Sequence, residues 1–135
     1  MKIEWALQAE GLGQDARGAF TIIGVNQNVL TVSSLPARTK RAIVLHIIEV
    51  EAGESLSLSL SMKDPDGVVV LAQSADMTPG EFLYTDIPTA FDVPAEMVIS
   101  VEKWGTYTFE AVVQGRSGGT SAATLSLYVR EVSRS

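Results

Sequence analysis

Residues 55–62 read SLSLSLSM, a strict alternation of serine with an apolar residue. Successive side chains of a β-strand point to opposite faces, so the three leucines and Met62 share one face and the serines share the other. On an α-helix the same residues would scatter around the cylinder. The alternation therefore predicts a half-buried strand, with one face in a core and one face in water.

The same period of two recurs along the chain. Apolar residues alternate with polar ones in segments 3–7, 20–22, 97–101, 107–113 and 125–129. Residues 42–50, AIVLHIIEV, are apolar in both phases, which is typical of a central strand covered on both sides. No segment of ten or more residues has a helical period, and only a short helical turn at 93–97 is compatible with the sequence.

Turn-forming residues separate these segments at intervals of roughly 8–12 residues, the spacing expected of a β-sandwich or barrel. Asp64-Pro65-Asp66-Gly67 predicts a hairpin turn, because proline presets one backbone angle and glycine accepts a positive φ. Further loops or turns are expected at 11–18, 26–28, 35–36 and 115–120. Pro88 and Pro94 indicate an irregular stretch or an edge strand, since proline donates no hydrogen bond to a sheet.

The chain has 135 residues, the size of one ordinary domain, and it contains no internal repeat and no linker. We expect an all-β fold: a two-layer antiparallel β-sandwich, immunoglobulin-like, with seven to nine strands in a single domain over residues 1–135.

Composition excludes several functional classes. The net charge is −6, with 10 Lys and Arg against 16 Asp and Glu, which disfavours nucleic acid as a partner. The absence of cysteine excludes disulfides, thiolate nucleophiles and the usual structural zinc sites, and one histidine excludes multi-histidine metal sites. The sequence shows no secretory signal and no apolar run of the roughly 20 residues that span a bilayer, so we expect a cytoplasmic protein without membrane association.

Three stretches carry a resemblance: KIEWALQAEG at the start, FTIIGVNQNVLTVSSLPA, and the hairpin around DPDGVVV. Together they resemble an uncharacterised family of small bacterial proteins, a domain of unknown function for which an immunoglobulin-like β-sandwich is expected. The tail GTYTFEAVVQG…ATLSLYV is similar to the last two strands of many all-β accessory modules. The resemblance implies a fold and a bacterial origin, and it implies no chemistry, because its motifs are structural.

His46 is the only histidine, and a general base would need a nucleophile and an orienting group beside it. No Gly-x-Ser-x-Gly elbow or similar motif supplies the nucleophile. We therefore interpret His46 as a structural residue on one face of a central strand, satisfied by a backbone or carboxylate partner.

Acidic side chains offer two candidate sites. Asp64 and Asp66 begin like a calcium loop, but four apolar residues follow Gly67 and supply no ligands, so a hairpin turn explains them better. Residues 64–102 contain acids and no Lys or Arg. The carboxylates of this region offer a glycosidase-like acid/base pair, but a solvated acidic edge explains them better. The candidates for the pair are Asp76, Glu81, Asp86, Asp92 and Glu96.

A platform for a sugar would need several exposed aromatic residues. Trp5 and Tyr107 alternate with core residues and are expected to be buried. Trp104 precedes a glycine at a turn, and Tyr128 falls on the hydrated face of the last strand. Surface aromatics more often mark a protein interface. The remaining aromatic candidate is Tyr84.

Two further clusters carry no site. Arg38, Lys40 and Arg41 are too few to bind nucleic acid, and they are expected to be solvated at the start of a strand or to contribute to self-association. Gly115, Gly118 and Gly119 precede no helix that would hold a phosphate.

These features favour a non-catalytic protein-interaction or assembly module, with a protein partner or self-association as a homo-oligomer. The sequence predicts no catalytic residues, no metal site and no cofactor. The alternative is a β-sandwich module that binds a carbohydrate or another small molecule, which requires a concave surface with an exposed Trp or Tyr flanked by polar side chains. An enzyme would require His46 beside an acid in an open pocket.

Overall fold

The computed structural model describes residues 1–17, 19–25, 28–51, 53–79, 86, 89–116 and 118–132, and among these residues it contains ten β-strands and no helix. The strands are β1 (Lys2–Ala9), β2 (Gly11–Gln14), β3 (Phe20–Ile23), β4 (Val29–Val32), β5 (Ala37–Ile48), β6 (Leu56–Lys63), β7 (Val69–Met77), β8 (Ala90–Val101), β9 (Gly105–Gly115) and β10 (Thr120–Glu131). The described residues accordingly hold no helix of the length and apolarity needed to cross a membrane. The expected all-β class is confirmed.

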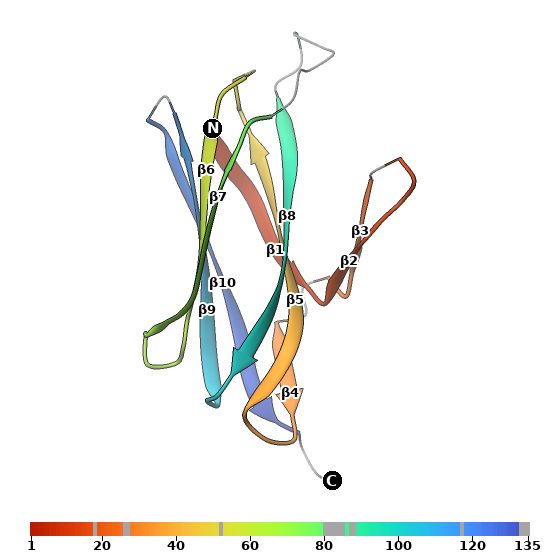
Figure 1. Ribbon diagram of the computed structural model, residues 1–135, viewed down its shortest axis with the longest axis vertical. Helices are drawn as coiled ribbons and strands as arrows, with labels where there is room; N and C mark the ends of the chain where they lie inside the picture. Colours follow the sequence, from red (N-terminus) through yellow and green to blue (C-terminus); the bar gives the residue numbers. More distant parts are fainter. Residues whose placement is uncertain are drawn as a thin grey trace.

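Three sheets contain these strands (Figure 1). One has three strands in the order β1-β5-β8, and a second has five strands in the order β4-β10-β9-β6-β7. The third is a two-stranded ribbon of β2 and β3 that projects to one side in Figure 1, and its strand β2 contacts β5 and β8. Neighbouring strands run antiparallel, with the exception of β4, which pairs parallel with β10.

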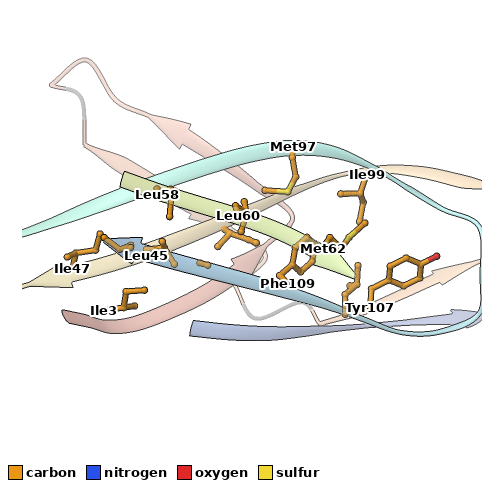
Figure 2. Close-up of a cluster of buried hydrophobic side chains, with 14 of the residues drawn as sticks. Ile3, Leu45, Ile47, Leu58, Leu60, Met62, Met97, Ile99, Tyr107 and Phe109 are labelled. Atoms are coloured by element: carbon orange, nitrogen blue, oxygen red, sulfur yellow. The ribbon is translucent and has the colours of Figure 1, made fainter. Parts of the chain in front are cut away.

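The two larger sheets share one hydrophobic core (Figure 2). Leu45 and Ile47 of β5 point into it from one sheet, and Leu60 of β6 and Phe109 of β9 point into it from the other. These four side chains are each at most 4% exposed. Burying them removes apolar surface from water, at about 25 cal/mol for each Å², and this stabilises the pairing of the two sheets.

Strand β6 has the two faces that its sequence predicts. Leu56, Leu58, Leu60 and Met62 are all buried in the core, as the alternation requires. Ser57 and Ser59 are exposed and Ser61 is half-buried. β6 lies inside its sheet, between β9 and β7, so its serine face is a face of the sheet.

The predicted hairpin turn after β6 is confirmed. The Asp64 N–H donates to the Val68 carbonyl at 2.8 Å, and the Gly67 N–H donates to the Asp64 carbonyl at 2.9 Å. Gly67 has a φ of 82°, a backbone conformation in which a side chain would be strained. The turn joins β6 to β7, which pair antiparallel.

Segment 42–50 supplies the central strand of the three-stranded sheet, as predicted, and Ala42 and Val44 are buried although they belong to the phase that faces away from the core. The helical turn with which the sequence at 93–97 is compatible does not form. Those residues belong to β8, which pairs with β5 over its whole length and places Pro94 opposite Val44. Since β8 is the last strand of its sheet, Pro94 lies in an edge strand, one of the two expected arrangements.

The predicted loop at 11–18 is also wrong, because Gly11–Gln14 forms β2 and pairs with Phe20–Ile23. The sequence GLGQ has two glycines, which are uncommon in strands, and is too short to show a period of two, so it gave no strand signal. The proposed turn at 26–28 and Pro88 fall wholly or mainly outside the described residues.

Two details of the expected architecture are corrected. The described residues contain ten strands where seven to nine were expected, and one pair, β4 with β10, is parallel rather than antiparallel. The additional strands are short: β2, β3 and β4 have four residues each. A period of two is barely visible over four residues, and periodicity carries no information about strand direction.

Candidate functional site

The five-stranded sheet leaves its outer face uncovered by any other described sheet. The inner-phase residues of β6, β9 and β10 fill the core, so the register places every second residue of these strands on the outer face. We call this the serine face. Most of its side chains are short and polar. It comprises Val29, Thr31, Ser57, Ser59, Ser61, Lys63, Ala72, Ser74, Asp76, Thr106, Thr108, Glu110, Val112, Gln114, Thr120, Ala122, Thr124, Ser126, Tyr128 and Arg130.

One end of the serine face carries large exposed side chains. Tyr128 lies opposite Thr106 of β9 and Val29 of β4, and its side chain is 37% exposed. Trp104 directly precedes β9 and is 43% exposed. Both aromatic residues line a surface hollow of about 370 Å³. The other residues of this hollow are Gly105, Thr106, Val129, Arg130 and Glu131.

The sequence identified Trp104 and Tyr128 separately as surface aromatics, and the structure brings them together. They are neighbours because Gly105 pairs with Val129 and Thr106 pairs with Tyr128. Sequence patterns do not give that register, so the hollow was not predicted. Arg130 of the same hollow is exposed and was not singled out from the sequence.

The segment that carries Trp104 is fixed by its neighbours. The Tyr107 hydroxyl accepts hydrogen bonds from the N–H groups of Glu102 at 3.1 Å and Lys103 at 3.2 Å. Gly105 has a φ of 122°, and a Cβ there would lie 3.2 Å from Pro65 Cγ, so this position favours glycine. The aromatic end of the serine face is therefore held in place before any partner binds.

Lys103 ties this segment to the β6–β7 turn. Its ammonium lies 2.9 Å from Asp64 Oδ2 and 2.6 Å from Asp66 Oδ2. Hydrogen bonds from Lys103 and from the Val68 N–H lower the pKa of Asp64, against the opposing effect of desolvation. The hydrogen bond to Asp66 raises the pKa of Lys103 most, and the hydrogen bond to Asp64 raises it further.

In the sequence, Asp64 and Asp66 begin like a calcium loop. In the structure, the Lys103 ammonium lies between the two carboxylates. The other Asp64 oxygen accepts the N–H groups of Asp66 and Val68, as a turn residue does. Within the described ranges, no three His, Asp or Glu side chains gather as metal ligands.

His46 lies on the outer face of the three-stranded sheet. Its Nδ1 is 2.6 Å from Asp92 Oδ1, and its ring stacks on Trp5 with a centroid distance of 5.0 Å. The predicted carboxylate partner is confirmed. The predicted burial of Trp5 is wrong, because a register irregularity between Ile3 and Trp5 reverses the phase and leaves the indole 39% exposed.

The other carboxylates lie on two different sheets. Asp76 of β7 accepts a hydrogen bond from the Ser57 hydroxyl at 2.9 Å. Glu96 of β8 contacts the Lys40 ammonium at 3.1 Å and accepts the Leu12 N–H at 3.0 Å, and these two bonds lower its pKa. Asp86 is exposed, and Glu81 and Tyr84 lie outside the described residues. Asp76 is exposed in the edge strand β7 of one sheet, and Asp92 and Glu96 are exposed in the edge strand β8 of the other, so the solvated acidic groups expected from the sequence lie on two edges.

Arg41 was expected to be solvated and is instead buried, at 3% exposure. It belongs to the same phase of β5 as Ile43 and Leu45, so the strand directs it inward. Its Nη2 donates to Gln8 Oε1 at 3.4 Å, and Gln8 Nε2 donates to the Ser126 carbonyl. Desolvation lowers the pKa of Arg41, and the nearby Glu10 opposes that effect. Lys40 and Arg38 are exposed, as predicted.

A scan against protein-family models found no match for this chain, and a search of curated proteins found none either. The resemblance to a family of small bacterial β-sandwich proteins therefore stays a prediction.

Proposed function

We propose that this protein is a non-catalytic protein-interaction module, and that it binds its partner through the serine face. One observation carries the proposal: Trp104, Tyr128 and Arg130 converge at the end of a broad sheet face made of short polar side chains. Trp, Tyr and Arg are the residues that most often dominate the binding energy of protein interfaces.

The rest of the serine face suits the same role. Serine and threonine hydroxyls both donate and accept hydrogen bonds, so a partner surface finds matching groups without long side chains having to be ordered. Trp104 sits on a segment held by Tyr107 and Lys103, and a preordered anchor lowers the entropic cost of binding. The face carries two acids, Asp76 and Glu110, and two bases, Lys63 and Arg130, which is not the continuous basic surface that a nucleic acid requires.

The proposal includes the finer description of the fold, an immunoglobulin-like two-layer sandwich. Support comes from the strand orders β1-β5-β8 and β4-β10-β9-β6-β7 of the described residues. They correspond to strands A-B-E and A′-G-F-C-C′ of a variable-type immunoglobulin domain if β2 and β3 are an insertion and strands C″ and D are left out. Tyr107 adds to this. It lies near the start of β9, and its hydroxyl bonds to the backbone a few residues upstream, as in the tyrosine corner of such domains.

Binding is favoured over catalysis by the surroundings of the only histidine. His46 bonds to Asp92 through Nδ1 and stacks under Trp5, on the sheet opposite to the hollow. The contacts of His46 tie three adjacent strands together, and a structural role accounts for all of them.

A carbohydrate or another small polar ligand is the second candidate, and one observation favours it. The hollow is concave, exposes a tryptophan and a tyrosine, and places Arg130 and Glu131 beside them. Its volume of about 370 Å³ falls within the range of small-molecule sites.

The test compares three immobilised proteins: the wild type, the double variant Trp104→Ala/Tyr128→Ala, and the control Val98→Ala. Val98 is 55% exposed on the outer face of the other sheet, so the control removes an exposed apolar side chain elsewhere. We expect the wild type and the control to retain a protein from the native host that the double variant loses. If the wild type and the double variant retain the same proteins, the proposal is contradicted.

A glycan array probed with the same three proteins separates the second candidate from the first. The carbohydrate function is favoured if only the double variant loses sugar binding and all three proteins retain the same host proteins. Thermal melting of each protein accompanies both assays and shows that the variants are folded.

A further inference from the structure

Strand β7 forms one edge of the five-stranded sheet. It pairs with β6 on one side, and no other described strand pairs with it on the other side. All of its nine residues except Leu71 and Met77 are exposed. The open side of such a strand presents a row of unpaired backbone N–H and carbonyl groups, which is a template for another strand.

Other edges in the described part of the chain carry features that discourage pairing. β1 has a register irregularity and two charged residues, Lys2 and Glu4. β4 has only four residues. β8 contains Pro94 between Asp92 and Glu96. Irregularity, shortness, charge and proline are the devices by which sheet proteins block edge-to-edge association.

β7 lacks these devices over most of its length. Its register is irregular only at the first end, where Lys63 pairs with Val69 and Met62 pairs with Leu71. Its sequence VVLAQSADM contains no proline and a single charged residue, Asp76. The low charge and the absence of proline leave the open backbone groups of this edge free to pair with another strand.

An apolar groove of about 270 Å³ opens beside this edge, between β7 and β8. Its lining includes the β7 residue Met77 and the β8 residue Val93, with Leu58 and Leu60 of β6. A strand added to β7 would therefore gain apolar contacts on its inner face as well as backbone hydrogen bonds.

We propose that the β7 edge binds the β7 edge of a second copy of this chain, so that two five-stranded sheets join into one. A two-fold axis makes the same surface meet itself and closes the assembly at two copies. The register must keep inner residues opposite inner residues, because a shift by one residue would turn apolar side chains to the wrong face.

Among the registers that meet this condition, one centred on Ser74 matches the side chains best. It places Leu71 of one copy opposite Met77 of the other, on the inner side where the groove opens. It also places Asp76 opposite Ala72, so that the only charge of the strand meets no like charge. The two Ser74 residues then face each other across the axis.

The chain contains no cysteine, so single-cysteine variants report this geometry directly. In Ser74→Cys the two thiols lie directly opposite each other, within the Cβ separation of about 4.5–5.5 Å that a disulfide can bridge after small shifts. The matched control is Ser59→Cys, which is exposed on the same face but lies in β6, one strand inside the edge. We expect Ser74→Cys to form a disulfide-linked dimer at least about tenfold faster than Ser59→Cys under mild oxidation.

Sedimentation of the wild type, Ser74→Lys and Ser59→Lys provides the second measurement. Two lysines opposite each other at the axis repel, so Ser74→Lys is expected to sediment as a folded monomer while the wild type and Ser59→Lys sediment as dimers. Equal crosslinking of the two cysteine variants, or a wild type that stays monomeric at every concentration, overturns the proposal. Because both readouts use the protein alone, they are independent of the partner proposed above.

Discussion

The indole ring of Trp5 stacks on the imidazole ring of His46, with the ring planes inclined by only 9°. The imidazole in turn bonds to Asp92, so one residue from each of β1, β5 and β8 forms a continuous cluster across the three-stranded sheet. This cluster lies on the outer face of the sheet, and it gives His46 its partners within the apolar second half of β5.

Replacing His46 by alanine is expected to cost about 1–3 kcal/mol of unfolding free energy, because the change removes both an aromatic stack and a hydrogen bond to a carboxylate. Urea unfolding measures this cost. If the variant unfolds like the wild type and instead abolishes a binding or catalytic activity, the structural role of His46 is wrong.

The Tyr107 hydroxyl is buried and accepts two backbone N–H groups, whereas the Tyr128 side chain is partly exposed. Tyr107→Phe should therefore destabilise the protein by about 1–3 kcal/mol, since two backbone N–H groups lose their acceptor. Tyr128→Phe is the matched control and should stay within about 0.5 kcal/mol of the wild type. Similar melting temperatures for the two variants would contradict the role assigned to Tyr107.

The two phases of β6 should respond differently to truncation. Leu58→Ala removes buried carbon and leaves a cavity, so a cost of about 2–5 kcal/mol is expected. Ser59→Ala should lie within about 0.5 kcal/mol of the wild type, because its hydroxyl is exposed. Ser59 is a better control than Ser57, which donates to Asp76. Equal costs at positions 58 and 59 would mean that both faces of β6 are buried.

The contact of Lys103 with Asp64 should make stability depend on pH at both extremes. The pKa of Asp64 is lowered by folding, so its carboxylate stabilises the fold above the unfolded value of about 3.9, and the contribution disappears as pH falls through the folded-state pKa. The pKa of Lys103 is raised, so its contribution is complete below about 10.4 and disappears as pH rises through the folded-state value.

Melting temperatures across the acid range test this dependence. Asp64→Asn should melt below the wild type near neutral pH, and the difference should shrink as the pH falls through the pKa of Asp64. The control Asp86→Asn changes an exposed carboxyl, and its curve should follow that of the wild type. A difference for Asp64→Asn that stays constant with pH would show that ionisation of Asp64 does not stabilise the fold.

Much of the fold could be predicted because strands with one buried face record their orientation in a period of two. Leu58 and Ser59 are the clearest case, and the turn at Asp64–Gly67 follows from residues with fixed conformational preferences. Trp5 shows the limit of this reasoning. One irregular residue between Ile3 and Trp5 changes which residues of the strand point to the core, and the sequence does not reveal it. Arg41 shows another limit, because a charge in the inward phase is buried when Gln8 provides a hydrogen-bonding partner.

The candidate site could be predicted only in its parts. Tyr128 was placed on the hydrated face and Trp104 at a turn, and both placements hold. Their proximity depends on the register of the β9–β10 hairpin, and the glycine-rich sequence 115–120 is compatible with more than one turn length, so the sequence alone does not give that register. The parallel pairing of β4 with β10 joins segments far apart in the chain and leaves no local pattern in the sequence.

The most direct test of the proposed function is a comparison of the two outer faces by photo-crosslinking in the native host. A photoreactive residue is introduced singly at Thr124, in the middle of the serine face, or at Val98, on the outer face of the other sheet. Both positions are exposed, so neither replacement should disturb the core. The account predicts a crosslinked partner protein from position 124 and none from position 98. Crosslinking from position 98 alone, or from neither position, would contradict it.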